Sequence, residues 1–126
     1  MNADDLLAES YWMHWILSNC DSREDRLKAE KLGWAPDQLD DVIRAKDLGH
    51  VLDLISKLAE MAPNEFARQC LAAGPVEDLL CMLDLGRVAE LRQAVRNSKA
   101  LAELMAMCVQ ISPPEVADRA QESLRS

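Results

Sequence analysis

All four glycines and all five prolines fall where the periodicity of apolar residues breaks, and this placement constrains the fold more than any other feature. Glycine favours the end of a helix and proline its first turn, so both residues mark helix boundaries. Between the boundaries, apolar residues recur at the helical spacing i, i+3, i+4, i+7. Threonine is missing, and valine and isoleucine together number eleven against 19 leucines and 17 alanines, which disfavours strands. We therefore predict an all-α chain.

This punctuation divides the chain into about nine short helices. We expect them at about residues 3–19, 22–32, 36–47, 50–62, 63–73, 75–85, 88–96, 98–111 and 113–125. At 126 residues the chain has the length of one compact domain. Within this single domain, 1–126, we expect aromatic and acidic N-terminal helices over 1–48 and an array of helix hairpins over 49–126.

A faint internal similarity appears at an offset of 50 residues. Four positions recur there: Leu54, Pro63, Glu65 and Ala67 return as Leu104, Pro113, Glu115 and Ala117. Both segments are predicted to form a helix, a proline corner and a second helix, as in a short array of stacked helix hairpins. Shared rules for helix ends also produce such identities, so a true repeat and coincidence both stay open.

Acidic residues outnumber basic ones by 22 to 14, which gives a net charge of -8. This charge repels nucleic acids and anionic membranes and favours a partner protein with a basic surface. The excess is concentrated in residues 1–60, which hold thirteen acids and seven bases. We therefore expect an acidic docking face in the N-terminal half, and four acids there are the candidates for steering a partner: Asp37, Asp40, Asp41 and Asp47.

The four cysteines and the N-terminal sequence indicate a cytoplasmic location. No pair of cysteines has the spacing C-x-x-C, and apolar neighbours favour buried, reduced thiols over disulfides or zinc ligands. The opening "MNADDLL" is acidic and differs from a signal peptide. No segment reaches the roughly 20 apolar residues of a membrane span.

The sequence contains few residues suited to catalysis or metal binding. His14 and His50 are the two histidines, and neither has a partner at a convincing ligand spacing. Neighbouring carboxylates such as Asp40 and Asp41 are interpreted as solvated charge or helix caps. We predict no catalytic residues, no metal site and no cofactor.

The segment "SYWMHWIL" concentrates three of the five aromatic residues, Tyr11, Trp12 and Trp15. On a helix these side chains spread over most of the circumference, so one face packs inward and the other needs a cover. Either the domain itself covers it, for example with the helix near Trp34, or a second subunit or partner protein does. In the second case Tyr11, Trp12, Trp15 and Trp34 are candidate partner-binding residues, since Trp and Tyr are enriched in binding hot spots.

The segment "AAGPVED" at residues 72–78 raises the alternatives of a phosphate-binding loop and a helix corner. A phosphate cradle needs several glycines and backbone N–H groups that converge on the anion. This segment has one glycine, a proline without an N–H and two carboxylates, which excludes that interpretation. We predict a corner, with Pro75 in the first turn of a new helix and the two acids at the positive end of its dipole.

The run "LAAGPVEDLL", preceded by "VLDLISKLAEMAP", resembles a bacterial domain family of unknown function. That family has a small-small-Gly-Pro-apolar-Glu-Asp-Leu-Leu segment between helices, which corresponds to Ala72 to Leu80 here. The resemblance covers about residues 50–110. It implies a compact all-helical domain of bacterial or phage origin and implies nothing about activity.

Three functional hypotheses follow from these observations. The first is a non-enzymatic protein-binding protein, a small acidic inhibitor of the immunity, antitoxin or phage-inhibitor type that occludes a partner surface. The alternative is a helical scaffold or a homo-oligomerisation module whose aromatic helix forms a homodimer. The third is an enzyme, which would require a cleft that holds a histidine, a carboxylate and a nucleophile together.

Overall fold

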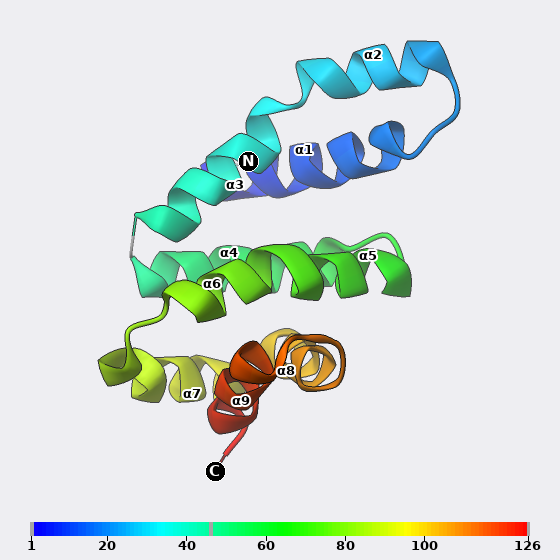
Figure 1. The fold of residues 1–126 in the computed structure, drawn as a ribbon. Coiled ribbons are helices and arrows are strands. Elements are labelled where there is room, and N and C mark those ends of the chain that lie inside the picture. Colours follow the sequence, from blue (N-terminus) through cyan, green and yellow to red (C-terminus); the bar gives the residue numbers. More distant parts are fainter. Residues whose placement is uncertain (1, 46, 126) are drawn as a thin grey trace.

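The computed structural model describes residues 2–45 and 47–125, and helices make up most of them (Figure 1). The helices are α1 (Ala3–Ser18), α2 (Arg23–Lys31), α3 (Trp34–Arg44), α4 (Leu48–Met61), α5 (Glu65–Leu71), α6 (Glu77–Met82), α7 (Val88–Asn97), α8 (Lys99–Ile111) and α9 (Pro114–Ser123). A π-helical turn, η1 (Ala72–Val76), joins α5 to α6, and a 3-10 turn, η2 (Leu85–Arg87), precedes α7. The described residues form no strand, so the predicted all-α fold is confirmed.

The helices lie in three layers, with α1 to α3 above, α4 to α6 in the middle and α7 to α9 below (Figure 1). α4 is central, because it packs against α1 in the upper layer and against α8 in the lower one. One hydrophobic cluster continues through all three layers, from Leu7 of α1 to Ala120 of α9. The N-terminal helices and the predicted hairpin array therefore share a core.

The apolar stripe of α4 is buried as its spacing predicts. Leu54, Ile55 and Leu58 are fully inaccessible to solvent, and burying each such side chain contributes roughly 1.5–3 kcal/mol. Met61, at the end of the same predicted stripe, is 38% exposed because the helix ends there. The other side of α4 carries the polar residues Asp53, Ser56 and Glu60, which are exposed or half-buried.

The predicted corner at Gly74 and Pro75 is wrong in detail, because the chain stays helical from α5 through η1 into α6. The N–H of Glu77 reaches back five residues to the carbonyl of Ala72, which is the bond of a π-helical turn. A proline inside an α-helix has no N–H to donate, and its ring crowds the carbonyl one turn earlier. The wider π turn accommodates Pro75 without ending the helix.

Trp12 on the aromatic helix is covered by the domain itself and not by a second subunit or a partner. Its side chain is 4% exposed, and its indole N–H donates a hydrogen bond to the carbonyl oxygen of Leu58, 2.8 Å away. The rings of Tyr11 and Trp15 contact it edge-on, with centroid distances of 5.0 and 5.9 Å. The domain itself thus covers Trp12, so this residue is not available as a partner-binding residue in this conformation.

Two polar contacts join the start of α1 to α4. The imidazole Nε2 of His50 lies 3.0 and 3.1 Å from the two carboxylate oxygens of Asp4, and Lys57 forms an ion pair with Asp5. The Asp4 carboxylate raises the pKa of His50, and the nearby Asp47 and Asp53 act in the same direction. The acidic first turn of α1 is therefore neutralised within the chain.

Replacing Trp12 by Phe should lower the free energy of unfolding by about 1–3 kcal/mol, because it removes core volume and leaves the Leu58 carbonyl without its indole donor. Urea denaturation measures the change. The matched variant Trp34→Phe alters a side chain that is 43% exposed and should change stability by about 0.5 kcal/mol or less. Equal losses in the two variants would contradict the structural role assigned to Trp12.

Replacing His50 by Gln should remove a pH-dependent part of the stability. The pKa of His50 is raised in the folded state, so its contribution is complete below its ordinary pKa of 6.5 and is lost as the pH rises through the raised value. The stability difference between wild type and His50→Gln should therefore shrink from pH 5.5 to pH 9. Denaturation at several pH values measures this, and Asp4→Asn should reproduce it whereas His14→Gln should not.

Candidate functional site

Two of the four acids predicted to steer a partner already form a contact within the chain. Asp40 forms an ion pair with Arg44 at 3.2 Å, and Asp47 accepts a hydrogen bond from the backbone N–H of His50 at the start of α4. Asp37 and Asp41 are exposed and form no hydrogen bond or ion pair through their side chains with other described residues. The predicted acidic face is thus half engaged within the chain.

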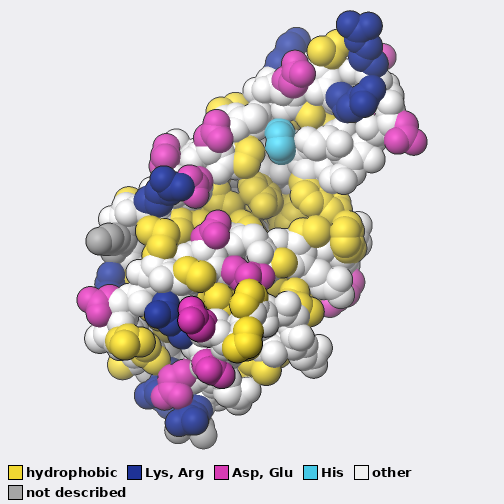
Figure 2. Space-filling view, in the orientation of Figure 1, with side chains coloured by type: hydrophobic (Ala, Val, Ile, Leu, Met, Phe, Trp, Pro, Cys, Tyr) yellow, Lys and Arg dark blue, Asp and Glu magenta, His cyan; other side chains and the backbone are white. Residues whose placement is uncertain are grey.

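The predicted aromatic residues do not form one surface. Tyr11 and Trp15 are partly buried at the edge of the core, and Trp34 is exposed at the start of α3. Phe66 of α5 is 62% exposed and contacts Trp15 with a centroid distance of 6.0 Å. Figure 2 shows hydrophobic side chains gathered in a recess between the upper and middle layers.

Two of the predicted residues, Tyr11 and Asp40, line one small cleft of about 120 Å³. Pro75 and Asp78, from the segment around η1, lie on the same cleft. Burial raises the pKa of Tyr11, so its phenol stays neutral at physiological pH. The cleft has room for no more than a single side chain of a partner.

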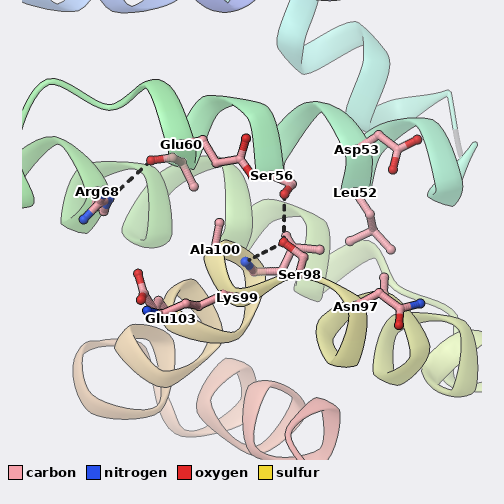
Figure 3. Close-up of a pocket in the computed structure, with 13 residues that line it drawn as sticks. Leu52, Asp53, Ser56, Glu60, Arg68, Asn97, Ser98, Lys99, Ala100 and Glu103 are labelled. Carbon is pink, nitrogen blue, oxygen red and sulfur yellow. Dashed lines mark hydrogen bonds between the residues drawn. The ribbon is translucent and has the colours of Figure 1, made fainter.

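A much longer groove runs between two pairs of helices, α4 with α5 on one side and α7 with α8 on the other. It consists of three adjoining cavities of about 530, 750 and 420 Å³. The first two share Asp53 and Ala94, and the last two share Arg68 and Glu103, so together they form one continuous depression. We call it the acidic groove, and Figure 3 shows its central cavity.

The centre of the acidic groove contains a pair of hydroxyl groups that hydrogen-bond to each other beside buried apolar residues. The hydroxyl groups of Ser56 on α4 and Ser98 before α8 lie 2.8 Å apart and hydrogen-bond to each other (Figure 3). Ser98 also caps α8, because its hydroxyl oxygen accepts the backbone N–H of Leu101 at 3.2 Å. This pair fixes the corner between α7 and α8 against α4 and thereby sets the separation of the two walls.

Acidic side chains dominate the groove. Five acids line it, against two bases: Asp53, Glu60, Glu65, Glu90 and Glu103 against Arg68 and Lys99. The acids at its two ends are already paired, Glu65 with Arg68 at 3.4 Å and Glu90 with Arg87 at 2.9 Å.

Three carboxylates remain available in the groove. Asp53, Glu60 and Glu103 are exposed, and none of them forms a hydrogen bond or an ion pair within the described part of the chain. Figure 3 shows them along the central cavity, Asp53 and Glu60 from α4 and Glu103 from the opposite wall. The groove therefore carries more acidic than basic charge, with acids on both walls, while Lys99 lines the same cavity and Asp53 and Glu60 help to raise the pKa values of His50 and Lys57.

Sequence reasoning missed these residues, although a signal for them exists. Asp53, Ser56 and Glu60 have the spacing i, i+3, i+7 and form the polar face opposite the predicted apolar stripe. The sequence thus identifies a solvent-facing side of α4. It does not show that this side faces the polar side of α8 across a gap.

The acidic groove offers no arrangement typical of covalent chemistry. Its lining contains no histidine, cysteine or tyrosine, and the imidazole of His50, which follows the groove residue Gly49, is hydrogen-bonded to Asp4. In the described ranges, no group of three or more His, Cys, Asp and Glu side chains is placed to hold a metal ion. Its charged and amide side chains suit electrostatic binding, and the expectation that the chain is not an enzyme stays a prediction.

All four cysteines are free thiols, but their predicted burial holds for one of them. Cys108 is buried, and burial raises the pKa of its thiol, whereas Cys81 is exposed and Cys20 and Cys70 are intermediate. Cys81 lies on the outer side of α6, opposite the buried Leu79 and Leu80. Among the described residues, no helix combines the length and the apolar character needed to cross a membrane.

Comparison with known proteins identifies a family. No curated protein and no solved structure matches the chain. A family model, described as a family of unknown function (DUF6869), matches residues 22–125. The match contains the segment Ala72 to Leu80 and begins well before residue 50, where the resemblance seen in the sequence starts. It includes the whole acidic groove and leaves out α1. Because the match covers most of the chain, we conclude that the chain belongs to the DUF6869 family of unknown function.

Proposed function

We propose that this chain is a non-enzymatic protein-binding protein whose acidic groove covers a basic surface of another protein. The observation that carries the proposal is that Asp53, Glu60 and Glu103, which form no ion pair among the described residues, line one shared depression from both of its walls. Such a chain would act as immunity, antitoxin or phage-inhibitor proteins do, by occluding a functional surface of the partner.

The physical basis is electrostatic complementarity combined with covered area. Exposed ion pairs each contribute about 0–1 kcal/mol, so three carboxylates alone do not produce tight binding. Their larger effect is to steer a basic partner and to select against acidic ones. Affinity then comes from contact along the three cavities, which extend from Gly49 on α4 to Gln110 on α8.

The setting that we propose is the cytoplasm of a bacterium or of a phage-infected cell. A reducing compartment agrees with four free thiols, one of which, Cys81, is exposed. The net charge of -8 supports a protein partner with a basic surface, and it disfavours nucleic acids and membranes as partners.

A second candidate function, a homo-oligomerisation module, is favoured by the pair of Trp15 and Phe66. The ring of Phe66 is 62% exposed and contacts Trp15. Figure 2 shows a recess rich in hydrophobic side chains between the upper and middle layers, and exposed apolar surface of this kind suits a second copy of the chain. Sedimentation of wild type and Phe66→Ser at nanomolar concentration separates the candidates. A dimer that Phe66→Ser dissociates supports oligomerisation, and a monomeric wild type contradicts it.

Neutralising the groove should weaken the binding of a basic peptide. In Asp53→Asn/Glu103→Gln, we expect the affinity for a fluorescent 20-residue peptide of lysine and alanine to fall about tenfold, because two unpaired carboxylates are removed. Fluorescence anisotropy measures the affinity, and binding by the wild type should weaken between about 50 and about 200 mM salt.

The matched control is Asp37→Asn/Asp41→Asn, which removes the same charge from the exposed face of α3 and should lower the affinity by no more than about twofold. If the α3 variant loses as much affinity as the groove variant or more, the binding surface is the one predicted from the sequence, and the groove proposal is overturned.

A further inference from the structure

We infer that the acidic groove takes a basic α-helix of the partner protein and not an extended segment. This inference rests on the proposed function, because it specifies the occupant of the same groove. Peptide segments are bound by folded domains in a small number of ways, and each way needs a different surface. The surfaces found here decide between them.

Addition of an extended segment to a sheet has no template in this protein. The described residues, 2–45 and 47–125, contain no strand and therefore no open sheet edge. An extended segment in the groove would leave backbone N–H and C=O groups covered and unpaired, at a cost of about 1–3 kcal/mol for each buried group. Ser56 and Ser98 are already hydrogen-bonded to each other, which leaves the separate amides of Gln93, Asn97 and Gln110 as the groove's uncharged partners and no continuous row of them.

Recognition of a proline-rich segment is also unsupported. Such segments bind in grooves lined by aromatic rings. None of the three cavities is lined by an aromatic residue, since the five aromatic residues of the chain lie elsewhere: Tyr11, Trp12, Trp15, Trp34 and Phe66. The groove therefore lacks the feature on which that mode depends.

A helix satisfies its own backbone and matches the walls of the groove. Small residues allow a helix to approach closely, and six glycine or alanine residues line the cavities: Gly49, Ala59, Ala89, Ala94, Ala100 and Ala106. A side chain added at Gly49 would meet only a carboxylate oxygen of Asp47, at 3.8 Å, which shows how open this end is.

The charges of the groove define the chemistry of that helix. Asp53 and Glu60 lie on α4 at i and i+7, and Glu103 lies on the opposite wall. Lysine or arginine at i, i+3 or i+4, and i+7 of a docked helix fall on one face with the same period. We therefore expect basic residues on the flanks of the helix and small or hydroxyl residues toward the Ser56 and Ser98 floor.

Two peptides of the same length, residue order and charge test the inference with the whole chain. The first is the lysine–alanine peptide closed into a helix by a hydrocarbon staple, and the second carries the same staple residues unclosed and two central D-amino acids that break the helix. Fluorescence anisotropy at about 50 mM salt should show the stapled helix binding about tenfold tighter or more, because it is already ordered.

The outcomes separate the inference from the proposal beneath it. If the broken peptide binds as tightly as the helix, and Asp53→Asn/Glu103→Gln weakens both, the occupant is extended and the inference fails while the groove proposal stands. If neither peptide binds, or if the groove variant binds both as the wild type does, the proposed function fails as well.

A steric variant checks that the helix lies in the groove. Ala89→Leu adds volume to the exposed end of the α7 wall without changing charge and should lower the affinity for the stapled helix about tenfold. Gln121→Leu on the exposed side of α9, outside all three cavities, should leave it unchanged. Equal affinities of the two variants for the stapled helix would overturn the inferred position.

Discussion

The packing of α4 between α1 on one side and α8 on the other is the constraint on which the rest of the structure depends. Leu54, Ile55 and Leu58 are completely covered because layers lie on both sides of this helix. With 3.6 residues per turn, a helix that is buried on two sides keeps only a narrow strip for solvent. On α4 that strip includes the exposed Asp53 and Glu60 and the half-buried Ser56. The packing that builds the core therefore also builds one wall of the acidic groove.

The same helix receives the polar contacts that hold the layers in place. Trp12 of α1 donates to the last turn of α4, and Ser98 before α8 meets Ser56 in its middle. Each neutral hydrogen bond contributes about 0.5–1.5 kcal/mol, which is small beside the burial of the leucines. Apolar side chains at the contact set how close the layers come, and the two hydrogen bonds add direction, because each aligns one donor with one acceptor. The width of the groove depends on that spacing.

The sequence predicts helix formation well, and it predicts poorly which helix faces are covered by segments distant in sequence. Helix formation depends on nearby residues, and the predicted all-α class is confirmed; Ser98 caps α8, at the start of the helix predicted over 98–111. Phe66 shares helical spacing with inward residues, but how far a face is covered depends on neighbours distant in sequence, and this ring stays exposed. The acidic groove was missed for the same reason. Its two walls are separated by about one third of the chain, and no local pattern records that they face each other.

The number of acids in a segment is a poor guide to the charge that a partner meets. Residues 1–60 hold thirteen acids, yet Asp4, Asp5, Asp40 and Asp47 are already engaged by His50, Lys57, Arg44 and the start of α4. A partner must break such a contact before it forms its own, so the net gain is small. Asp53, Glu60 and Glu103 require no such exchange. Asp53 and Glu60 belong to the same acid-rich segment, so binding should favour the acids that the fold leaves without an ion pair over the segment as a whole.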